Sequence, residues 1–319
     1  MSERKPRRWL RILLGSVAAL LIVAGAAWVW LTAREEVPAR SDYVLDLDEL
    51  RRLADSMPGA KPVDVATELV VEASLPRGVV FAGESFAPHP MVHQVFQVRW
   101  ADGSFAVIDS GMPRQVMERM GTGTFHDAAW AKIQAALKTA KFIMITHEHA
   151  DHIGGLAYVE PADALAGRLV LTSEQLANTN GLDQAGIPEA VRKAARPLAF
   201  EHATAIAPGV VVQKAAGHTP GSILVYVRTE AGREYLFIGD VAWHLDQLRQ
   251  LHYRPRLVTD LFIHEDRNAV LAEFRTLHDF MQAHPDVAVV VSHDQDERRK
   301  LVADGILIEG FASPSAEKG

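Results

Sequence analysis

The feature that most constrains this chain is a cluster of histidine and acidic residues at positions 146–152, Thr-His-Glu-His-Ala-Asp-His. It follows directly on residues 141–146, KFIMIT, a continuous apolar run typical of a strand buried on both faces. The end of a buried strand does not require three imidazoles and a carboxylate within six residues. Imidazole and carboxylate groups are the ligands that zinc, iron and manganese accept. The spacing therefore predicts a metal centre, in preference to a hydrogen-bonded polar turn.

Composition excludes several other chemistries. The 319 residues include no cysteine, which rules out disulfides, thiolate metal sites and cysteine nucleophiles. The formal net charge is −7, and residues 1–11 alone carry +4, so subtracting their share leaves −11 on the remainder. A protein that binds nucleic acid needs a basic surface, so an acidic main domain argues against that partner. A small-molecule substrate is the expected partner.

The N-terminal segment predicts a membrane anchor. Residues 12–32 carry no charge, and a helix of this length spans roughly 30 Å, the thickness of the hydrocarbon core of a bilayer. Trp28 and Trp30 lie where an interfacial aromatic belt is expected, and the basic residues of segment 1–11 predict a cytoplasmic N-terminus. The alternative is a cleaved signal peptide with residues 24–26 as the cleavage site. Both interpretations place the main domain on the extracytoplasmic (periplasmic or external) face, and we favour a retained anchor.

The remaining chain alternates between strand and helix patterns. A linker at 33–65 contains a short helical pattern at 45–57, and a polar tail at 312–319 is expected to be flexible. Strands are predicted at 68–73, 78–83, 93–100, 104–109, 141–146, 169–172, 210–215, 223–229, 234–239 and 286–291, and helices at 127–140, 187–195 and 265–283. Two β-rich halves that each end in helices predict helices flanking two packed mixed sheets.

The 146–152 motif resembles the signature of hydrolases with the metallo-β-lactamase fold, and further motifs of that family follow in its order. They are 107–111 (Val-Ile-Asp-Ser-Gly), 217–222 (Gly-His-Thr-Pro-Gly-Ser), 238–240 (Ile-Gly-Asp) and 292–294 (Ser-His-Asp). The resemblance covers residues 66–311 and implies an α/β fold, a four-layer αββα sandwich, preceded here by one transmembrane helix. It implies a hydrolase domain over those residues.

The resemblance also implies two metal sites. One would consist of His147, His149 and His218, the other of Asp151, His152 and His293, and Asp240 would bridge them. Two divalent ions, zinc first and iron or manganese as alternatives, would hold a hydroxide that attacks a carbonyl, because bound ions lower the pKa of water. Asp151 would act as a catalytic residue by orienting the hydroxide. Asp109 matches a residue that supports the ligands in this family.

Within the family, the quorum-quenching lactonases are the most similar group. The similarity lies in the segment 105–112, in the aromatic Trp243 three residues after Asp240, and in the sequence that follows His293. Those lactonases carry tyrosine at the position of Trp243, and an indole can donate a hydrogen bond but cannot act as an acid near neutrality. Tyr253 or His244 are conceivable substitutes. We expect Trp243 and His244 to line the substrate pocket, which loops 113–127, 175–187 and 244–265 would shape.

Other activities stay open at this stage. β-Lactam hydrolases share the exported location but generally lack the bridging aspartate, and thioester hydrolases resembling glyoxalase II share all seven ligands. A small phosphodiester is a further candidate substrate. A tethered binding protein without activity represents a different class, although members that lose activity usually lose ligands, and here all seven are present. An ester-like bond, a lactone first, is the favoured substrate.

Overall fold

Two β-sheets packed face to face form the centre of the computed structural model, which describes residues 6–121 and 123–311. The first sheet has eight strands, in the order β13 (Ile308–Glu309), β1 (Asp64–Pro76), β2 (Pro88–Arg99), β3 (Phe105–Ile108), β5 (Phe142–Met144), β6 (Leu169–Thr172) and β7 (Arg196–Leu198), with β4 (Gly123–Phe125) paired to β1. The second has five, in the order β12 (Ala288–Val290), β11 (Glu234–Phe237), β10 (Ile223–Arg228), β9 (Val210–Lys214) and β8 (Ala203–Ala207). Both sheets are mixed, because each contains parallel and antiparallel pairs.

Strand alternation places the central core between the sheets. In β2, Phe96 and Val98 face the second sheet, whereas Val95 belongs to the core on the opposite face. In β10, Val225 and Val227 point back toward the first sheet. Successive side chains of a strand point to opposite faces, so each sheet has a second apolar face that helices must cover.

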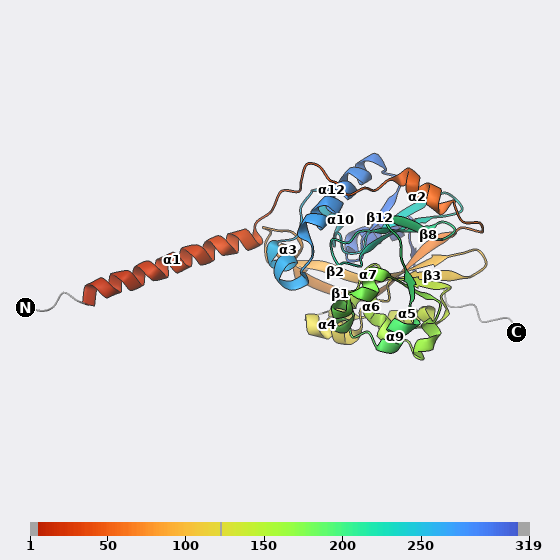
Figure 1. Ribbon diagram of the computed structural model, residues 1–319, viewed down its shortest axis with the longest axis horizontal. Helices are drawn as coiled ribbons and strands as arrows, with labels where there is room; N and C mark the ends of the chain where they lie inside the picture. The colour runs from red at the N-terminus through yellow and green to blue at the C-terminus, as the bar shows by residue number, and fades with distance from the viewer. Residues whose placement is uncertain (1–5, 122, 312–319) are drawn as a thin grey trace, which may run out of the picture.

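Helices cover both outer faces and complete an αββα sandwich (Figure 1). On the first sheet lie α4 (Arg114–Met120), α5 (Asp127–Thr139), α6 (Ala150–Ile153), η1 (Gly154–Tyr158), η2 (Ala162–Leu165), α8 (Thr179–Gln184) and α9 (Glu189–Ala194). On the second lie α2 (Leu47–Ala54), α10 (Leu245–Arg249) and α12 (Arg267–Ala283). Apart from the N-terminal helix, the remaining helices are α3 (Arg77–Val80), α7 (Ser173–Ala177), α11 (Arg256–Val258), η3 (Thr259–Ile263) and α13 (Gln295–Ala303). The predicted four-layer α/β fold is confirmed.

The strand predicted at 78–83 is wrong, because this segment contains the short helix α3. Strands β1 and β2 pair antiparallel from Asp64 opposite Arg99 to Pro76 opposite Pro88, so residues 77–87 have to reverse the chain. The apolar run predicted a strand, but Val80 and Phe81 instead bury their side chains in a small separate cluster. The need to reverse the chain between two paired strands outweighs the local β preference of these residues.

The first helix, α1 (Pro6–Thr32), projects from one side of the sandwich (Figure 1). Its stretch Trp9–Thr32 is long and apolar enough to cross a membrane, and none of it is buried against the rest of the protein. A signal sequence has the same properties. Part of the predicted basic segment, residues 1–5, and the predicted flexible tail at 312–319 lie outside the described residues.

Ion pairs fix the end of α1 to the domain. The carboxylate of Glu35 accepts hydrogen bonds of 2.7 Å from both Arg256 and Arg267. Arg34 donates to the carbonyl of Gln250 at 2.9 Å, and the guanidinium of Arg256 lies 4.9 Å from the centre of the Trp30 ring. The junction between helix and domain is therefore held by several directional contacts.

Candidate metal centre

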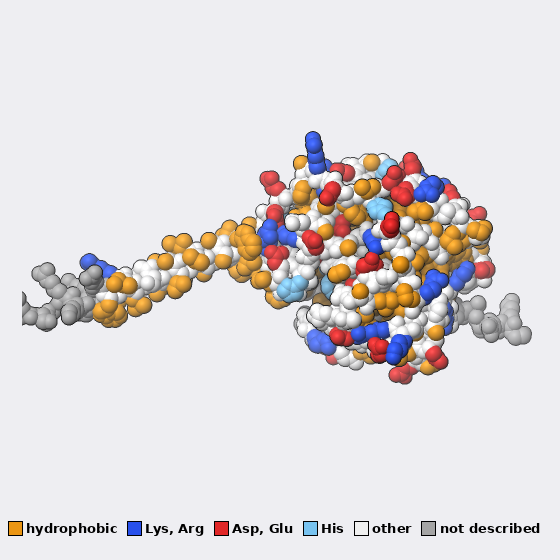
Figure 2. Space-filling model, viewed as in Figure 1, with side chains coloured by type: hydrophobic (Ala, Val, Ile, Leu, Met, Phe, Trp, Pro, Cys, Tyr) orange, Lys and Arg blue, Asp and Glu red, His pale blue; other side chains and the backbone are white. Residues whose placement is uncertain are grey.

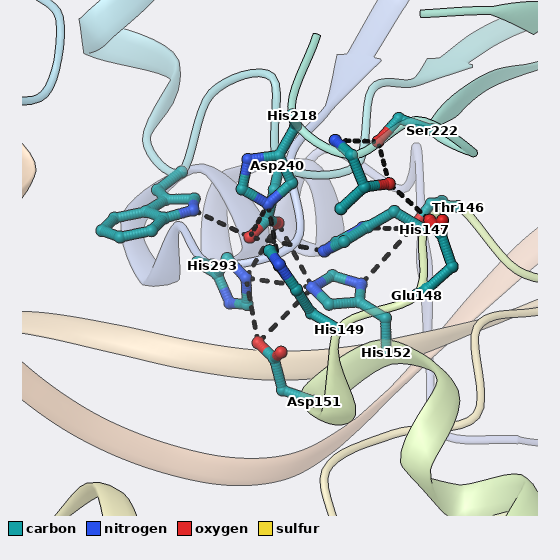
Figure 3. A network of polar contacts seen from close by, with 12 residues as sticks. Thr146, His147, Glu148, His149, Asp151, His152, His218, Ser222, Asp240 and His293 are labelled. Atoms are coloured by element: carbon teal, nitrogen blue, oxygen red, sulfur yellow. Dashed lines mark hydrogen bonds and ion pairs between the residues drawn. The ribbon is translucent and has the colours of Figure 1, made fainter. Parts of the chain in front are cut away.

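The histidine and aspartate side chains of the predicted site meet at one end of the two sheets, where β5, β11 and β12 end and β9 turns into β10. His149 lies at the N-terminus of α6, in extended conformation, and Asp151 and His152 occupy the first turn of this helix. The chain thus passes from β5 to α6 over residues 145–149, so the side chains of the motif come from both a loop and a helix. His218, Asp240 and His293 reach the same place from the second sheet (Figure 3).

The side chains form two groups that share one carboxylate. Potential ligand atoms lie within 4.8 Å of one another in each group; the groups are His147, His149, His218 and Asp240, and Asp151, His152, Asp240 and His293. Six of the seven residues that the sequence predicts as ligands therefore belong to one cluster each, and Asp240 belongs to both.

The two oxygens of Asp240 point toward different clusters. Its Oδ2 atom lies 3.6 Å from Nε2 of His218 and 3.9 Å from Nε2 of His147. Its Oδ1 atom lies 2.9 Å from Nε2 of His293 and 3.2 Å from Nε2 of His152. A carboxylate placed in this way can bind one ion through each oxygen.

The donor set fits divalent cations. Nε2 of His147 is buried without a hydrogen-bond partner, and Nε2 of His152 faces Nε2 of His293 at 3.2 Å. Buried polar atoms normally have partners, and a cation would satisfy several of these nitrogens together. Burial and neighbouring histidines lower the pKa of His147 well below its usual value, and burial and His218 lower the pKa of His149 to about 4. Both imidazoles are thus held neutral, the form that binds metals.

Hydrogen bonds orient three of the imidazoles. Nδ1 of His152 donates to Asp109 at 2.8 Å, Nδ1 of His218 to Glu265 at 2.9 Å, and Nδ1 of His293 to the carbonyl of Val92 at 2.8 Å. Because an oxygen of each partner accepts the Nδ1 proton, the tautomer assigned to each ring leaves the Nε2 lone pair free. Asp109, expected to support the ligands, adopts a left-handed backbone conformation with φ of 66° and also accepts from Thr146.

The comparison with known families agrees with this geometry. The family model described as "Metallo-beta-lactamase superfamily" matches residues 90–293, nearly two thirds of the chain. The chain belongs to the metallo-beta-lactamase superfamily. No curated protein sequence matches it.

Solved structures show the same fold for this metallo-beta-lactamase superfamily chain. A quorum-quenching N-acyl homoserine lactone lactonase superposes with a TM-score of 0.60 at 13% identity, covering 76% of this chain and 97% of the lactonase. An N-acyl homoserine lactone hydrolase with product N-hexanoyl-L-homoserine at its metal centre gives 0.59 at 13% identity, with coverage of 75% and 96%. A probable metal-dependent hydrolase from Staphylococcus aureus gives 0.54 at 14% identity, with coverage of 74% and 91%.

A pocket of about 730 Å³ opens onto the two clusters of this superfamily member. Five of the candidate ligands lie at its inner end, and the wall includes Met91, Met112 and Met117. Residues from all three of the loops expected to shape the pocket contribute, among them Val116, Asn180 and Phe262. The pocket therefore joins a polar end, at the clusters, to a largely apolar wall.

Trp243 lines this pocket as expected, and its Nε1 atom donates a hydrogen bond of 2.8 Å to Oδ2 of Asp240. The expectation that His244 also lines it is wrong. His244 caps α10 by accepting a hydrogen bond from the backbone of Asp246, and it lies 3.3 Å from Asp294. Adjacent side chains on an extended segment point in opposite directions, so only Trp243 faces the pocket.

Tyr253 is not available as a substitute for the missing tyrosine of the lactonases. Its side chain is buried, and its hydroxyl donates a short hydrogen bond to Glu265. Glu265 also pairs with the fully buried guanidinium of Arg254 at 2.9 Å. Although burial opposes ionisation, Arg254 and His218 lower the pKa of Glu265 to about 2. Tyr253 thus supports a carboxylate that orients His218, and it does not reach the pocket.

His93 also belongs to the site, although it lies in none of the sequence motifs. Nδ1 of His93 lies 3.3 Å from Oδ2 of Asp151, and its ring centre lies 4.5 Å from that of His293. It comes from the middle of β2 and lines the pocket. The available signal was an imidazole at the start of a predicted strand, which requires a polar partner when buried.

Proposed function

We propose that this chain is a membrane-anchored hydrolase that uses two divalent metal ions to open an ester-like bond, with a lactone as the favoured substrate. The observation that carries the proposal is the placement of Asp240, whose two oxygens face two separate histidine clusters. Two-metal hydrolases hold their ions about 3.5–4 Å apart, a spacing that a bridging carboxylate supports. Zinc is the first choice, and iron or manganese accept the same ligands.

The residues divide into binding and orienting roles. His147, His149 and His218 would hold one ion, Asp151, His152 and His293 the other, and Asp240 both. The ions would supply Lewis-acid chemistry, lowering the pKa of a water molecule and polarising the substrate carbonyl.

Asp151 is proposed to act directly in catalysis. Its side chain is partly exposed to the pocket and would accept a hydrogen bond from the attacking water. His93, at 3.3 Å, would hold this carboxylate in place. The indole of Trp243 would contact the substrate from the pocket wall.

The proposed location is a membrane, with the catalytic domain on the extracytoplasmic side. It is supported by the length and apolar character of α1 and by the basic residues that precede it in the sequence. Mass spectrometry of the protein purified from membranes tests the anchor. A mass that includes α1 supports it, whereas a chain beginning near residue 27 identifies a cleaved signal peptide.

Proton release by the detergent-solubilised full chain tests the reaction. A lactone, a β-lactam and a thioester are compared, and the Asp240→Ala variant serves as the inactive form. Asp246→Ala is the matched control, because this nearby aspartate is partly exposed and pairs with Arg249. Lactone turnover that is lost in Asp240→Ala and retained in Asp246→Ala supports the proposal.

The same assay discriminates the alternatives. Preferred turnover of the β-lactam or the thioester would replace the lactone as substrate while keeping the two-metal reaction. If a protein that holds two ions per chain turns over none of the three, the carbonyl substrate is rejected. A small phosphodiester is then the next substrate to test, and a binding role without catalysis follows it.

A further inference from the structure

Three large apolar side chains are exposed on the side of the domain that carries α1. Phe86 is 72% exposed, Leu261 53% and Phe262 73%. Outside α1, Phe86 and Phe262 are the most exposed large apolar side chains among the described residues. Exposed apolar groups that cluster on one face indicate a surface that contacts another molecule or a membrane.

The two segments that carry these side chains both contact the junction with α1. Leu261 and Phe262 lie in η3, which continues directly from α11, and α11 contacts the end of α1. Phe86 lies shortly after Gly83 in the chain, and Gly83 lies beside the junction. A Cβ atom added to this glycine would be 3.6 Å from the backbone nitrogen of Arg34. In Figure 1 the end of α1 meets the domain beside α3, and Figure 2 shows the apolar surface of α1 continuing to the edge of the domain.

The junction restricts how the domain can be oriented on a bilayer. Glu35, three residues after the end of α1, is held between Arg256 and Arg267 at 2.7 Å each. The exposed rings of Trp28 and Trp30 in the last turns of α1 are the kind of residue that lies at the membrane interface. If α1 spans the bilayer, its end fixes the adjacent segments near the interface. Phe86, Leu261 and Phe262 are then close to the lipid.

The pocket opens beside these side chains. Among the residues that line it, Phe262 at 73% and Met120 at 57% are strongly exposed, so they mark the opening. His149 and Asp240, at the other end, belong to the metal clusters. The methionines between the two ends form a flexible apolar wall that adapts to a chain-like ligand.

We propose that Phe86, Leu261 and Phe262 form a membrane-contact patch that inserts into the lipid interface, so that the pocket receives a substrate with a hydrocarbon chain directly from the bilayer. The inference rests on the proposed anchor and names the substrate class of the proposed hydrolase. The hydrocarbon chain would lie along the methionine wall, and the ester-like head would reach the metal clusters.

The absence of cysteine from the chain allows a direct test of the patch. Single substitutions Phe86→Cys, Phe262→Cys and Val44→Cys are spin-labelled in the full chain and reconstituted into phosphatidylcholine nanodiscs. Val44 is the matched control, since it is 57% exposed and lies just before α2, away from the junction. Labels at 86 and 262 are expected to collide more with oxygen, which concentrates in lipid, than with a water-soluble nickel complex. The label at 44 should show the opposite preference.

Labels at 86 and 262 that behave like the label at 44 overturn the proposal, whatever the hydrolase assay gives. This readout needs no turnover, so failure of the patch and failure of the proposed reaction are distinguishable. If the patch binds a soluble protein and not lipid, both labels stay exposed to water in the nanodisc. That result also rejects the proposed contact with the membrane.

A second measurement tests substrate entry. The double variant Phe86→Asp/Leu261→Asp leaves the pocket lining unchanged and places two charges in the patch. Hydrolysis of a lactone with a dodecyl chain dissolved in the nanodisc should fall by about tenfold, because two apolar groups no longer insert. Hydrolysis of a short water-soluble lactone should stay the same, and Val44→Asp should change neither rate. Equal rates for the dodecyl lactone in the double variant and the unmodified chain contradict entry from the bilayer.

Discussion

Nε1 of Trp243 donates a hydrogen bond of 2.8 Å to Oδ2 of Asp240, the oxygen that also faces His147 and His218. The indole therefore joins the wall of the pocket to the carboxylate shared by the two clusters. The guanidinium of Arg254 lies 4.7 Å from the ring centre and fixes its other side. A side chain held on both sides in this way presents a rigid surface to a substrate.

Replacing Trp243 should weaken substrate binding more than metal binding. We expect Trp243→Ala to raise KM by about tenfold, because the pocket loses a large contact surface, while two ions per chain are retained. Trp243→Phe keeps most of the ring and should recover most of the affinity. Steady-state kinetics and metal analysis measure the two effects, and an unchanged KM in Trp243→Ala would remove this residue from the pocket.

Asp109 is expected to control metal affinity without binding the ion. Asp109→Asn replaces the acceptor of the His152 Nδ1 proton with a weaker one, and removal of such a partner typically lowers metal affinity by about 10–100-fold. Competition with a chelator measures the change. Asp183→Asn, at an exposed pair with Arg192, is the control, and equal affinities in both variants would show that Asp109 has no orienting role.

Glu273 predicts a pH-dependent stability. Burial raises the pKa of Glu273 from 4.5 to about 8, and its Oε1 atom accepts a hydrogen bond of 3.0 Å from the backbone nitrogen of Gly217. The folded protein thus keeps a proton that the unfolded chain releases above pH 4.5. The contribution of this group to the free energy of unfolding therefore falls as pH rises from about 4.5 to about 8, and is constant below this window.

The variant Glu273→Gln should remove that dependence, because an amide keeps the hydrogen bond and carries no ionisable proton. Thermal unfolding of the full chain in detergent should give similar midpoints for both proteins at pH 4.5 and a higher midpoint for the variant at pH 8. Asp279→Asn, at an exposed position of the same helix, controls for the loss of one charge. A variant that follows the unmodified chain at every pH shows that Glu273 ionises normally.

His93 is expected to affect turnover. The variant His93→Gln keeps a polar side chain in β2 but removes the imidazole 3.3 Å from Asp151, so kcat should fall while metal content is unchanged. Supporting residues of this kind typically contribute 10–100-fold. His126→Gln, at a partly exposed pair with Glu72, is the control. Unchanged kcat in the His93 variant assigns the residue to packing alone.

The sequence predicted the layers of the fold and the candidate ligands because both depend on short patterns. Short runs rich in apolar residues define β2 and β10, and the spacing of the 146–152 motif places four polar side chains at the end of β5. His218, Asp240 and His293 became recognisable through their order after that motif. The structure brings all seven together, although His147 and His293 lie 146 positions apart in the sequence.

The contacts that the sequence did not predict depend on tertiary geometry. His93 lies in no motif, and only the folded structure brings it beside Asp151 and His293, which come from α6 and the loop after β12. Tyr253 lies in a segment without regular periodicity, and Glu265 lies at the predicted start of a helix, so no sequence pattern links either residue to His218. His244 does not line the pocket, because its role as the N-cap of α10 determines where its side chain points.

The short strand β13 has a consequence for the order in which the chain can fold. Ile308 lies beside Ala66 in a parallel pair with β1, and the backbone nitrogen of Phe311 donates to Glu68. The first strand of the domain thus pairs with the last strand that the structure describes. Such distant pairing slows folding, since a long loop has to close first. The edge of the first sheet at β1 therefore stays open until the chain has been made as far as β13.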